Sequence, residues 1–214
     1  MSVHQSHQRA RLHLPALRRT GDGPVSDAAA SGAAGQARQR TGSLAVARAA
    51  AVARIVLGLV FLWAFLDKTF GWGYATPSSG AWVNGGSPAK GFLGGVSAGP
   101  FESMFHSWAG QVWVDWLFML GLLGVGLAFL AGIALRPAAV AGTVMMAFMW
   151  AAEWPPASHL SDGSPSMSSN PVIDYHLVYA VLLIALAIAA AGRTWGLGGL
   201  WQQLPLVRRN PWLK

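Results

Sequence analysis

The chain has 214 residues, of which 53% are hydrophobic and only 11% are charged. Soluble domains carry about a quarter charged residues, so this composition excludes an ordinary soluble protein and indicates a membrane protein. The net charge of +7 comes largely from eight Lys and Arg residues in the first 54 positions. A basic terminus of this kind suits anionic lipid and cytoplasmic retention, and we expect no nucleic acid partner.

Residues 1–46 are rich in Arg, Gln, Ala, Gly and Ser and lack an apolar period that could bury a core. This composition predicts a disordered basic cytoplasmic tail. A cleaved signal peptide fits poorly, because the charged region is too long and no small-residue cleavage site follows the first apolar run. We expect a membrane domain over residues 47–193 and a cytoplasmic or interfacial C-terminal tail over residues 194–214.

Four apolar segments follow, at about residues 52–70, 112–135, 137–154 and 172–191. Each approaches the roughly 20 residues with which a helix crosses a bilayer core. The second and third are joined by so short a turn that they must form an antiparallel hairpin. The fourth opens with Asn170 and Pro171, a cap followed by proline that is typical of a helix start. The predicted fold class is all-α, a four-transmembrane-helix bundle.

Small residues recur at four-residue spacing on the second and third predicted spans. They are Gly124, Ala128 and Gly132 on the second span, and Ala138 and Gly142 on the third. Small side chains let helix backbones approach closely, so this pattern predicts helix contacts within one compact bundle.

The loop over residues 71–111 is long and rich in Gly and Pro. Within it, the segment PFESMFHSWAG can place Phe101, Phe105 and Trp108 on one helical face. We expect a short interfacial helix that covers the adjacent end of the bundle.

Basic residues outside the tail are concentrated at one end of the predicted spans, at Arg136, Arg193, Arg208, Arg209 and Lys214. By the positive-inside rule, both termini are cytoplasmic and the chain is a multi-pass protein of the cytoplasmic membrane. The opposite end receives ionisable residues from all four predicted helices and from two loops: Asp67, Lys68, Lys90, Glu102, His106, Asp115, Glu153, His159, Asp162, Asp174 and His176. We therefore expect a polar cluster at one membrane face.

Asp67 and Lys68 end the first predicted helix and have two interpretations. As an anchor pair they extend toward the lipid headgroups, which is a strong explanation for Lys68 alone. As a site, Asp67 faces inward and Lys68 offers positive charge to an anion, because an ionisable group in a membrane is costly unless it is paired or used. The sequence favours neither interpretation for Asp67.

The segment NPVIDYHLVYA places Asp174, Tyr175 and His176 in the first turns of the fourth predicted helix. A carboxylate there is stabilised by the positive end of the helix dipole without any function. His176, with Tyr179 three residues later on the same face, can hydrogen-bond a quinone headgroup and pass its protons to Asp174. A purely structural histidine is the alternative.

The chain contains no Cys, so it cannot supply a thiolate nucleophile, an iron–sulfur ligand or a disulfide relay. His106, His159 and His176 come from two loops and one helix without an HxxxH pair, and we predict no metal or haem site. Redox chemistry must then use a borrowed cofactor or a partner. Trp63 and Trp150 lie deep in the predicted spans and could line a quinone pocket, although packing is the safer interpretation.

Three segments, RIVLGLVFLWAFLDKTFG, GGSPAKGFL and NPVIDYHLVYAVLLIALA, resemble the DoxX/DoxD-like membrane proteins, especially the membrane subunit of thiosulfate:quinone oxidoreductase. The resemblance covers roughly residues 54–193. It implies a four-helix protein that oxidises thiosulfate to tetrathionate, gives electrons to membrane quinone and commonly works with a second subunit. By matching position, the residues it implicates are Asp67, Lys68, Asp174 and His176.

Two hypotheses for function follow. In the first, the chain is the quinone-reactive subunit of an oxidoreductase, whose candidate residues are Asp67, Asp174 and His176 for catalysis, Lys68 and Lys90 for the substrate anion, and Tyr179 and Trp63 for the quinone cofactor. In the second, it is a non-catalytic DoxX-type membrane scaffold that docks a soluble redox or stress-response partner. A transporter is a distant third, because no inverted repeat is visible. The sequence leaves oligomer formation open.

Overall fold

The computed structural model describes residues 24–213, with the backbone alone at residues 24–31, 33, 34 and 37. The chain divides into two compact units after Gly42, and the larger unit begins at Ser43. Throughout the described part of the chain, the regular structure is helical apart from one isolated β-bridge between His159 and Pro165. The predicted all-α fold class is therefore confirmed.

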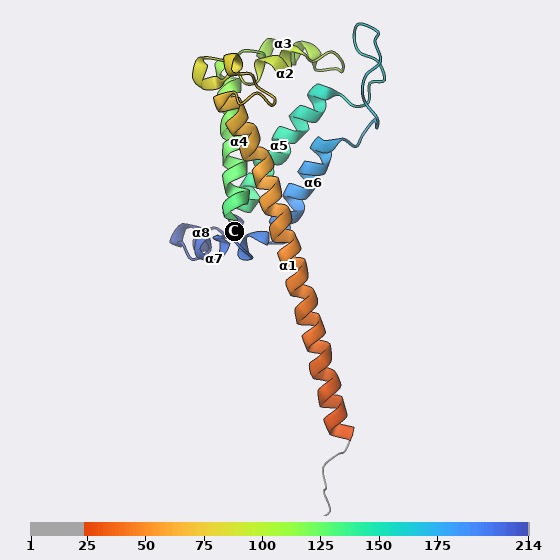
Figure 1. Cartoon of the computed structure of the whole chain (residues 1–214), viewed down its shortest axis with the longest axis vertical. Coiled ribbons are helices and arrows are strands. Elements are labelled where there is room, and N and C mark those ends of the chain that lie inside the picture. The colour runs from red at the N-terminus through yellow and green to blue at the C-terminus, as the bar shows by residue number, and fades with distance from the viewer. Residues whose placement is uncertain (1–23, 214) are drawn as a thin grey trace, which may run out of the picture. The chain divides into compact units, whose positions relative to one another are not determined.

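Figure 1 shows the arrangement of the elements along the chain. The α-helices are α1 (Pro24–Phe70), α2 (Lys90–Gly94), α3 (Glu102–Trp108), α4 (Val112–Ala131), α5 (Leu135–Glu153), α6 (Tyr175–Ile188), α7 (Gly198–Trp201) and α8 (Pro205–Arg209). Short 3-10 helices lie between or after them, namely η1 (Ser78–Gly80), η2 (Trp82–Asn84), η3 (Ala191–Arg193) and η4 (Pro211–Leu213).

Three helical stretches are long and apolar enough to cross a membrane: Arg38–Phe70 within α1, Val112–Ala131 and Leu135–Glu153. The fourth apolar helix, α6, has only 14 residues. At 1.5 Å per residue it measures about 21 Å, which is shorter than the roughly 30 Å core of a bilayer. The structure thus contains three candidate spans and one shorter apolar helix where the sequence predicted four full-length spans.

The fourth helix begins later than the sequence predicted. Asn170, expected to cap it, instead accepts hydrogen bonds through its side-chain oxygen from the backbone N–H groups of Val172 (2.9 Å) and Ile173 (2.8 Å). The cap is Asp174, whose Oδ1 accepts a hydrogen bond from the N–H of Leu177 at 3.0 Å. A carboxylate at this position stabilises the positive end of the helix, so Asp174 sets the helix start.

The segment predicted as a disordered basic tail lies partly outside the described residues. Over residues 32–46 the structure differs from the prediction, because the backbone is helical as part of α1 and its described side chains are exposed. Ala, Arg and Gln are strong helix formers and this stretch has no proline. Local propensity therefore accounts for a helix here without a buried apolar face.

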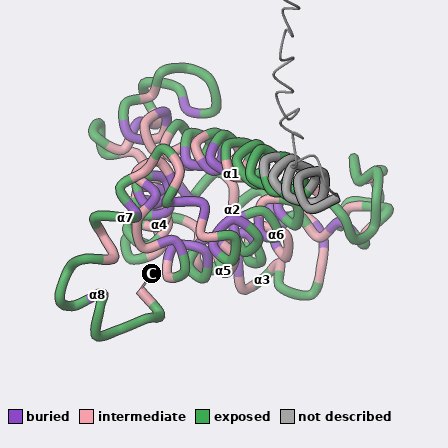
Figure 2. Tube along the Cα trace, turned by 90° about the horizontal axis from the view of Figure 1, so that it is seen from below, coloured by how far each residue is buried: buried purple, intermediate pink, exposed green. Residues whose placement is uncertain are grey.

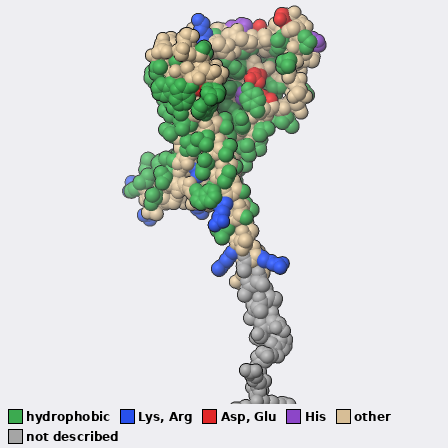
Figure 3. Space-filling view, viewed as in Figure 1, with side chains coloured by type: hydrophobic (Ala, Val, Ile, Leu, Met, Phe, Trp, Pro, Cys, Tyr) green, Lys and Arg blue, Asp and Glu red, His purple; other side chains and the backbone are tan. Residues whose placement is uncertain are grey.

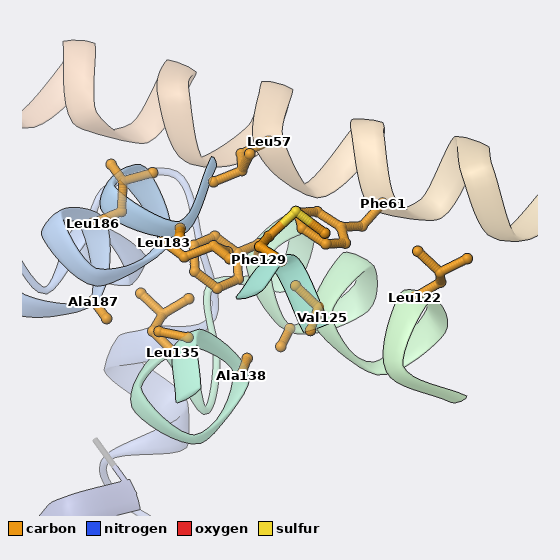
Figure 4. Packing of buried hydrophobic residues seen from close by; sticks show 14 of the residues in the cluster. Leu57, Phe61, Leu122, Val125, Phe129, Leu135, Ala138, Leu183, Leu186 and Ala187 are labelled. Carbon is orange, nitrogen blue, oxygen red and sulfur yellow. The ribbon is translucent and has the colours of Figure 1, made fainter. Parts of the chain in front are cut away.

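The core of the larger unit lies where α1, α4, α5 and α6 meet (Figure 4). Phe61, Phe129 and Leu183 bring together three of these helices and are each at most 2% exposed. Seen from below, buried residues concentrate on the sides of α4, α5 and α6 that face one another (Figure 2). Many apolar residues on the outer faces are exposed, as expected of helices that contact lipid.

Helices α1 and α4 cross at a pair of glycines. A Cβ atom at Gly58 would lie 2.7 Å from the backbone nitrogen of Leu130, and one at Gly126 would lie 2.8 Å from the backbone nitrogen of Leu62. Real Cβ atoms do not approach backbone atoms this closely. Neither position can take a side chain unless the two helices separate.

The predicted pattern of small contact residues is correct in part. Gly142 faces α6, since a Cβ there would meet the side chain of Leu183 at 2.6 Å. Gly132 ends α4 in the left-handed conformation, with φ of 72°. Gly124, however, is exposed, and outside its own helix no described atom lies within 4 Å of its Cβ position. The contact glycine of α4 is Gly126, two residues later and on another face.

The different positions of Gly126 and Gly124 predict different effects of the same substitution. We expect Gly126→Ala to lower the free energy of unfolding by about 1–3 kcal/mol, because the added methyl group overpacks the α1–α4 crossing. Gly124→Ala should be neutral or raise the stability by up to about 1 kcal/mol, since alanine is the better helix former. Unfolding of both variants in mixed micelles, followed by circular dichroism, measures the difference. Equal effects would contradict the crossing geometry.

Arg54 is the most unusual residue of the interior, with 0% of its surface exposed. Its guanidinium donates hydrogen bonds to the carbonyls of Phe129 and Leu130 (2.8 Å to the latter) at the end of α4. It also donates to the carbonyls of Thr194 (3.5 Å) and Trp195 (2.9 Å) after η3. One buried cation therefore joins α1, the last carbonyls of α4 and the segment that follows α6.

The predicted short helix in the loop after α1 is present as α3. Its Phe105, 1% exposed, packs against Leu93 of α2 and Ala152 of α5. Figure 3 shows the Asp, Glu and His side chains gathered at the end of the molecule where α2 and α3 lie. The helices thus deliver their acidic ends to one side of the bundle, as the sequence predicted.

Candidate functional site

A group of ionisable side chains forms where α5 ends and α6 begins. Glu153 is the last residue of α5, Asp174 caps α6, and Tyr175 and His176 are its first two residues. Helices α5 and α6 pack against each other extensively, so the end of one lies beside the start of the other. These four residues are called the α5–α6 network below.

Two hydrogen-bonded pairs, joined by one longer ionic contact, make up the α5–α6 network. The Asp174 Oδ2 lies 2.8 Å from the Nδ1 of His176, and the Glu153 Oε2 lies 3.8 Å from the same nitrogen. The hydroxyl of Tyr175 donates to the Oε1 of Glu153 at 2.7 Å. His176 is 1% exposed while Glu153 is exposed, so the network leads from the interior to the surface.

Asp174 determines which nitrogen of His176 is free. Its carboxylate only accepts hydrogen bonds, so in the neutral imidazole the proton lies on Nδ1 and Nε2 keeps a lone pair. This Nε2 is buried and has no hydrogen-bond partner among the described residues. A buried polar atom without a partner costs about 1–3 kcal/mol, whereas a base that takes up and releases protons needs such a free position.

The α5–α6 network also has the composition of a cation site. Glu153, Asp174 and His176 each offer one ligand atom, and these atoms lie within 4.8 Å of one another. Carboxylate and imidazole ligands suit divalent transition metals. The 2.8 Å separation of the Asp174 Oδ2 and the His176 Nδ1 is also the length of a hydrogen bond.

A cavity of 480 Å³ adjoins the α5–α6 network. Glu153, Asp174 and Tyr175 line it, together with Ser168 and Asn170 from the loop between α5 and α6. Polar residues on its wall are compatible with water. The network therefore borders a cavity with both polar and apolar walls on one side, while His176 is buried on the other.

Asp67 has a structural role in the geometry of the loop after α1. Its carboxylate accepts hydrogen bonds from the backbone N–H groups of Tyr74 (3.3 Å) and Ala75 (3.0 Å), and the residue is 1% exposed. The inward-facing interpretation thus describes Asp67 better than the anchor interpretation. Asp115 acts similarly at the start of α4, where it accepts the N–H of Ala89 at 2.9 Å.

We expect Asp67→Ala to lower the free energy of unfolding by about 2–4 kcal/mol, because two N–H groups lose a charged acceptor that is itself buried. Asp67→Asn retains one acceptor oxygen and should cost about half as much. Hydrogen exchange at the amides of Tyr74 and Ala75 measures the local effect. Unchanged protection of both amides in Asp67→Ala would refute this role.

The two lysines of the predicted site lie in different surroundings. Lys68 lines a second, apolar cavity, and its Nζ lies 5.8 Å from the ring centroid of Phe118 on α4. Lys90 is exposed at the start of α2, where its side chain extends past Gly110. No hydrogen bond or ion pair among residues 38–213 links Asp67 or Lys68 to Asp174 or His176.

The aromatic residues predicted to hold quinone are also separated. Trp63 is 45% exposed and packs edge-on against Tyr74, with ring centroids 5.1 Å apart. Tyr179 packs against Phe61 and Tyr175, at 6.5 Å and 6.0 Å between centroids. Neither Trp63 nor Tyr179 lines either of the two cavities described here. Tyr179 remains beside the α5–α6 network, and Trp63 does not.

Sequence reasoning missed Glu153 and Tyr175 as members of the site. Glu153 was placed at the correct end of the bundle but was not assigned to Asp174 and His176. The usable signal was its position immediately before Trp154 and two prolines, which ends α5 opposite the start of α6.

No protein-family model, curated protein or solved structure matches this chain. The resemblance to DoxX/DoxD-like proteins therefore stays a prediction. Any assignment of function depends on the geometry of the α5–α6 network and its surroundings.

Proposed function

We propose that the chain is a multi-pass protein of the cytoplasmic membrane that acts as the quinone-reactive subunit of an oxidoreductase. In this proposal α1, α4 and α5 span the bilayer, and α6 is the fourth span, completed at both ends by the residues that flank it. Both termini are cytoplasmic and the α5–α6 network lies at the outer face. Apolar outer helix faces and the segregation of charge support this placement.

The observation that carries the proposal is the pairing of Asp174 with His176, which leaves a buried, unpartnered Nε2. A quinone headgroup has carbonyl oxygens that take up protons on reduction and hydroxyl groups that release them on oxidation. His176 Nε2 exchanges such a proton directly, and Asp174 stabilises the imidazolium that forms. For binding, the headgroup must reach Nε2 from the apolar side, which requires packed side chains such as Tyr179 to move aside.

The rest of the network supplies the route for the proton. In quinone reduction, as the Nε2 of His176 gives a proton to the quinone oxygen, Nδ1 receives one from protonated Asp174, whose Oδ2 lies 2.8 Å away, and Nε2 is left bare. Glu153 and Asp174 line the adjoining cavity, where water can supply protons to them. The α5–α6 network thus connects a quinone in the apolar interior with the outer aqueous phase.

The electron donor we propose is thiosulfate, on the strength of the resemblance. Two thiosulfate ions form one tetrathionate ion and release two electrons, which together with two protons reduce one quinone to the hydroquinone. The two carboxylates of the α5–α6 network repel a dianion, so thiosulfate fits better near the exposed Lys90. Because the chain has no Cys to hold a sulfur intermediate, a second subunit is expected to complete the donor site.

The test is thiosulfate-dependent reduction of decylubiquinone by the purified protein in lipid nanodiscs, with any subunit that co-purifies. Formation of one tetrathionate per hydroquinone supports the proposal. Failure to reduce the quinone analogue with thiosulfate, above the rate without protein, contradicts thiosulfate as the donor. Failure of the protein in the same nanodiscs to bind decylubiquinone contradicts the quinone-reactive role.

One observation favours the scaffold as a second candidate. The loop between α5 and α6 is largely exposed, and its Met167 is 98% exposed. The loop is nevertheless held against α3, because the Ser161 hydroxyl donates to Glu102 at 2.6 Å and its N–H to the carbonyl of Ser97 at 2.6 Å. A fixed, exposed loop of this kind can dock a soluble redox partner. Tight co-purification of such a partner without bound quinone would favour this function.

A further inference from the structure

A second cavity, of 520 Å³, plays no part in the proposed quinone chemistry. Helices α4 and α5 form its sides, and α2 and α3 cover its end. Its wall is apolar, with Trp108, Trp113, Phe118 and Met149 among its residues, and Lys68 is the only charged residue on it within the described chain. This hollow is called the α4–α5 groove below. Its volume falls in the range of about 300–1,000 Å³ that is typical of small-molecule sites.

Within the described residues Lys68 forms no salt bridge, although the carboxylate of the neighbouring Asp67 attracts it electrostatically. Its neighbour Asp67 directs its carboxylate to the N–H groups of Tyr74 and Ala75. In the described part of the chain, no acidic side chain forms an ion pair with Lys68, and its ammonium group lies over the face of the Phe118 ring. An ammonium group at the edge of an apolar membrane cavity favours an anionic partner.

The groove is open on the side that faces lipid in the proposed membrane placement. Leu117, Val144 and Phe148 line it and are 67%, 50% and 48% exposed. Its end is closed by α2 and α3, whose Leu93 and Phe105 are buried. A ligand therefore enters sideways from the bilayer, and its polar end must fit beneath this cover next to Lys68.

Length and charge restrict the class of ligand. From Met149 to Ala141, the groove follows eight residues of α5, which corresponds to about 12 Å along the helix axis. A single alkyl chain fits this narrow apolar path. The single ammonium group matches a compact monovalent anion, whereas a phospholipid would bring a second chain and a bulky headgroup beneath an apolar cover. These features together indicate a long-chain carboxylate.

We propose that the α4–α5 groove binds a membrane fatty acid, with its alkyl chain between α4 and α5 and its carboxylate on the ammonium group of Lys68. This inference uses the membrane placement proposed above and does not depend on the quinone chemistry. Hydrophobic contact supplies most of the binding, and the ion pair selects the acid over neutral chains.

Equilibrium binding of radiolabelled palmitate to the detergent-solubilised full chain tests the proposal. Lys68→Gln keeps most of the stem and removes the charge, and the control Lys90→Gln removes an exposed charge outside the groove. We expect Lys68→Gln to weaken palmitate binding about tenfold, which corresponds to the loss of one charge-assisted hydrogen bond, and Lys90→Gln to leave it unchanged. Val144→Trp fills the open side of the groove and should weaken binding while retaining Lys68.

The matched ligand is methyl palmitate, which has the same chain and no charge. It should bind the unmodified protein about tenfold more weakly than palmitate, and Lys68→Gln should leave its binding unchanged. Equal binding of the acid and the ester, or equal palmitate binding by Lys68→Gln and Lys90→Gln, would overturn the proposal. So would preferential, Lys68-dependent binding of decylubiquinone in the same groove. Because Val144→Trp retains the charge, it tests the groove even if Lys68→Gln does not fold.

Discussion

Arg54→Ala is expected to lower the free energy of unfolding by about 3–5 kcal/mol, more than Gly126→Ala or Asp67→Ala. The guanidinium holds the carbonyls of Phe129 and Leu130 at the end of α4 and those of Thr194 and Trp195 after η3. Without it, these acceptors lose a buried cation and a cavity forms between three segments. For a protein of this size we expect a fall in Tm of roughly 10 °C.

The matched control is Arg48→Ala, which removes an exposed arginine from the same helix. It should change the stability by less than about 0.5 kcal/mol, as is usual for a surface substitution. Arg54→Lys should lie between the two, because an ammonium group cannot bridge both sets of carbonyls as a planar guanidinium does. Thermal unfolding in detergent compares the three. Similar Tm values for the two alanine variants would contradict the bridging role of Arg54.

Asp174→Asn is expected to reduce quinone turnover by about 10²–10⁴-fold, the loss typical of a removed general base. Asparagine can still cap α6 through its side-chain oxygen. Its amide group, however, donates to the Nδ1 of His176 and has no proton to pass to it, so the relay from Asp174 through the imidazole to the quinone is lost. The quinone turnover of His176→Ala should fall at least as much. Both rates are measured in nanodiscs with decylubiquinone under saturating donor.

Asp162→Asn is the control for the loss of one carboxylate at the same end of the molecule. Hydrogen bonds from the hydroxyl and backbone N–H of Ser164 hold the pKa of Asp162 below its usual range, and this exposed residue contacts neither cavity. Its turnover should match that of the unmodified protein. Equal losses in Asp162→Asn and Asp174→Asn would indicate a general effect of charge and would refute the role of Asp174 as the partner of His176.

The sequence predicted at which end of the bundle the charged residues lie, but not which of them contact one another. Adjacent residues on a helix point in directions about 100° apart, so Asp67 and Lys68 do not share a site although they share a motif. Asp67 turns to the loop after α1, and Lys68 turns to Phe118 on α4. Only tertiary packing determines which way each of them faces.

The sequence pattern alone also could not show which glycine of α4 faces α1 or which residue caps α6. The small-residue repeat on α4 pointed to Gly124, while the close crossing with α1 uses Gly126. Asn170 and Asp174 are both good caps, and the structure selects Asp174, which also holds His176. The pairing of Glu153 with Tyr175 joins residues 22 positions apart on two helices. No local pattern predicts such a contact.

The most direct test of the central claim is nitrogen-15 NMR of imidazole-labelled protein in nanodiscs, with His176 assigned by comparison with His176→Gln. We predict a neutral ring that is protonated on Nδ1 and bare on Nε2, and a shift of the Nε2 signal when decylubiquinol is added. Asp174→Asn should move the proton to Nε2. A His176 signal that is insensitive both to the quinol and to Asp174→Asn would contradict the proposed role of the α5–α6 network.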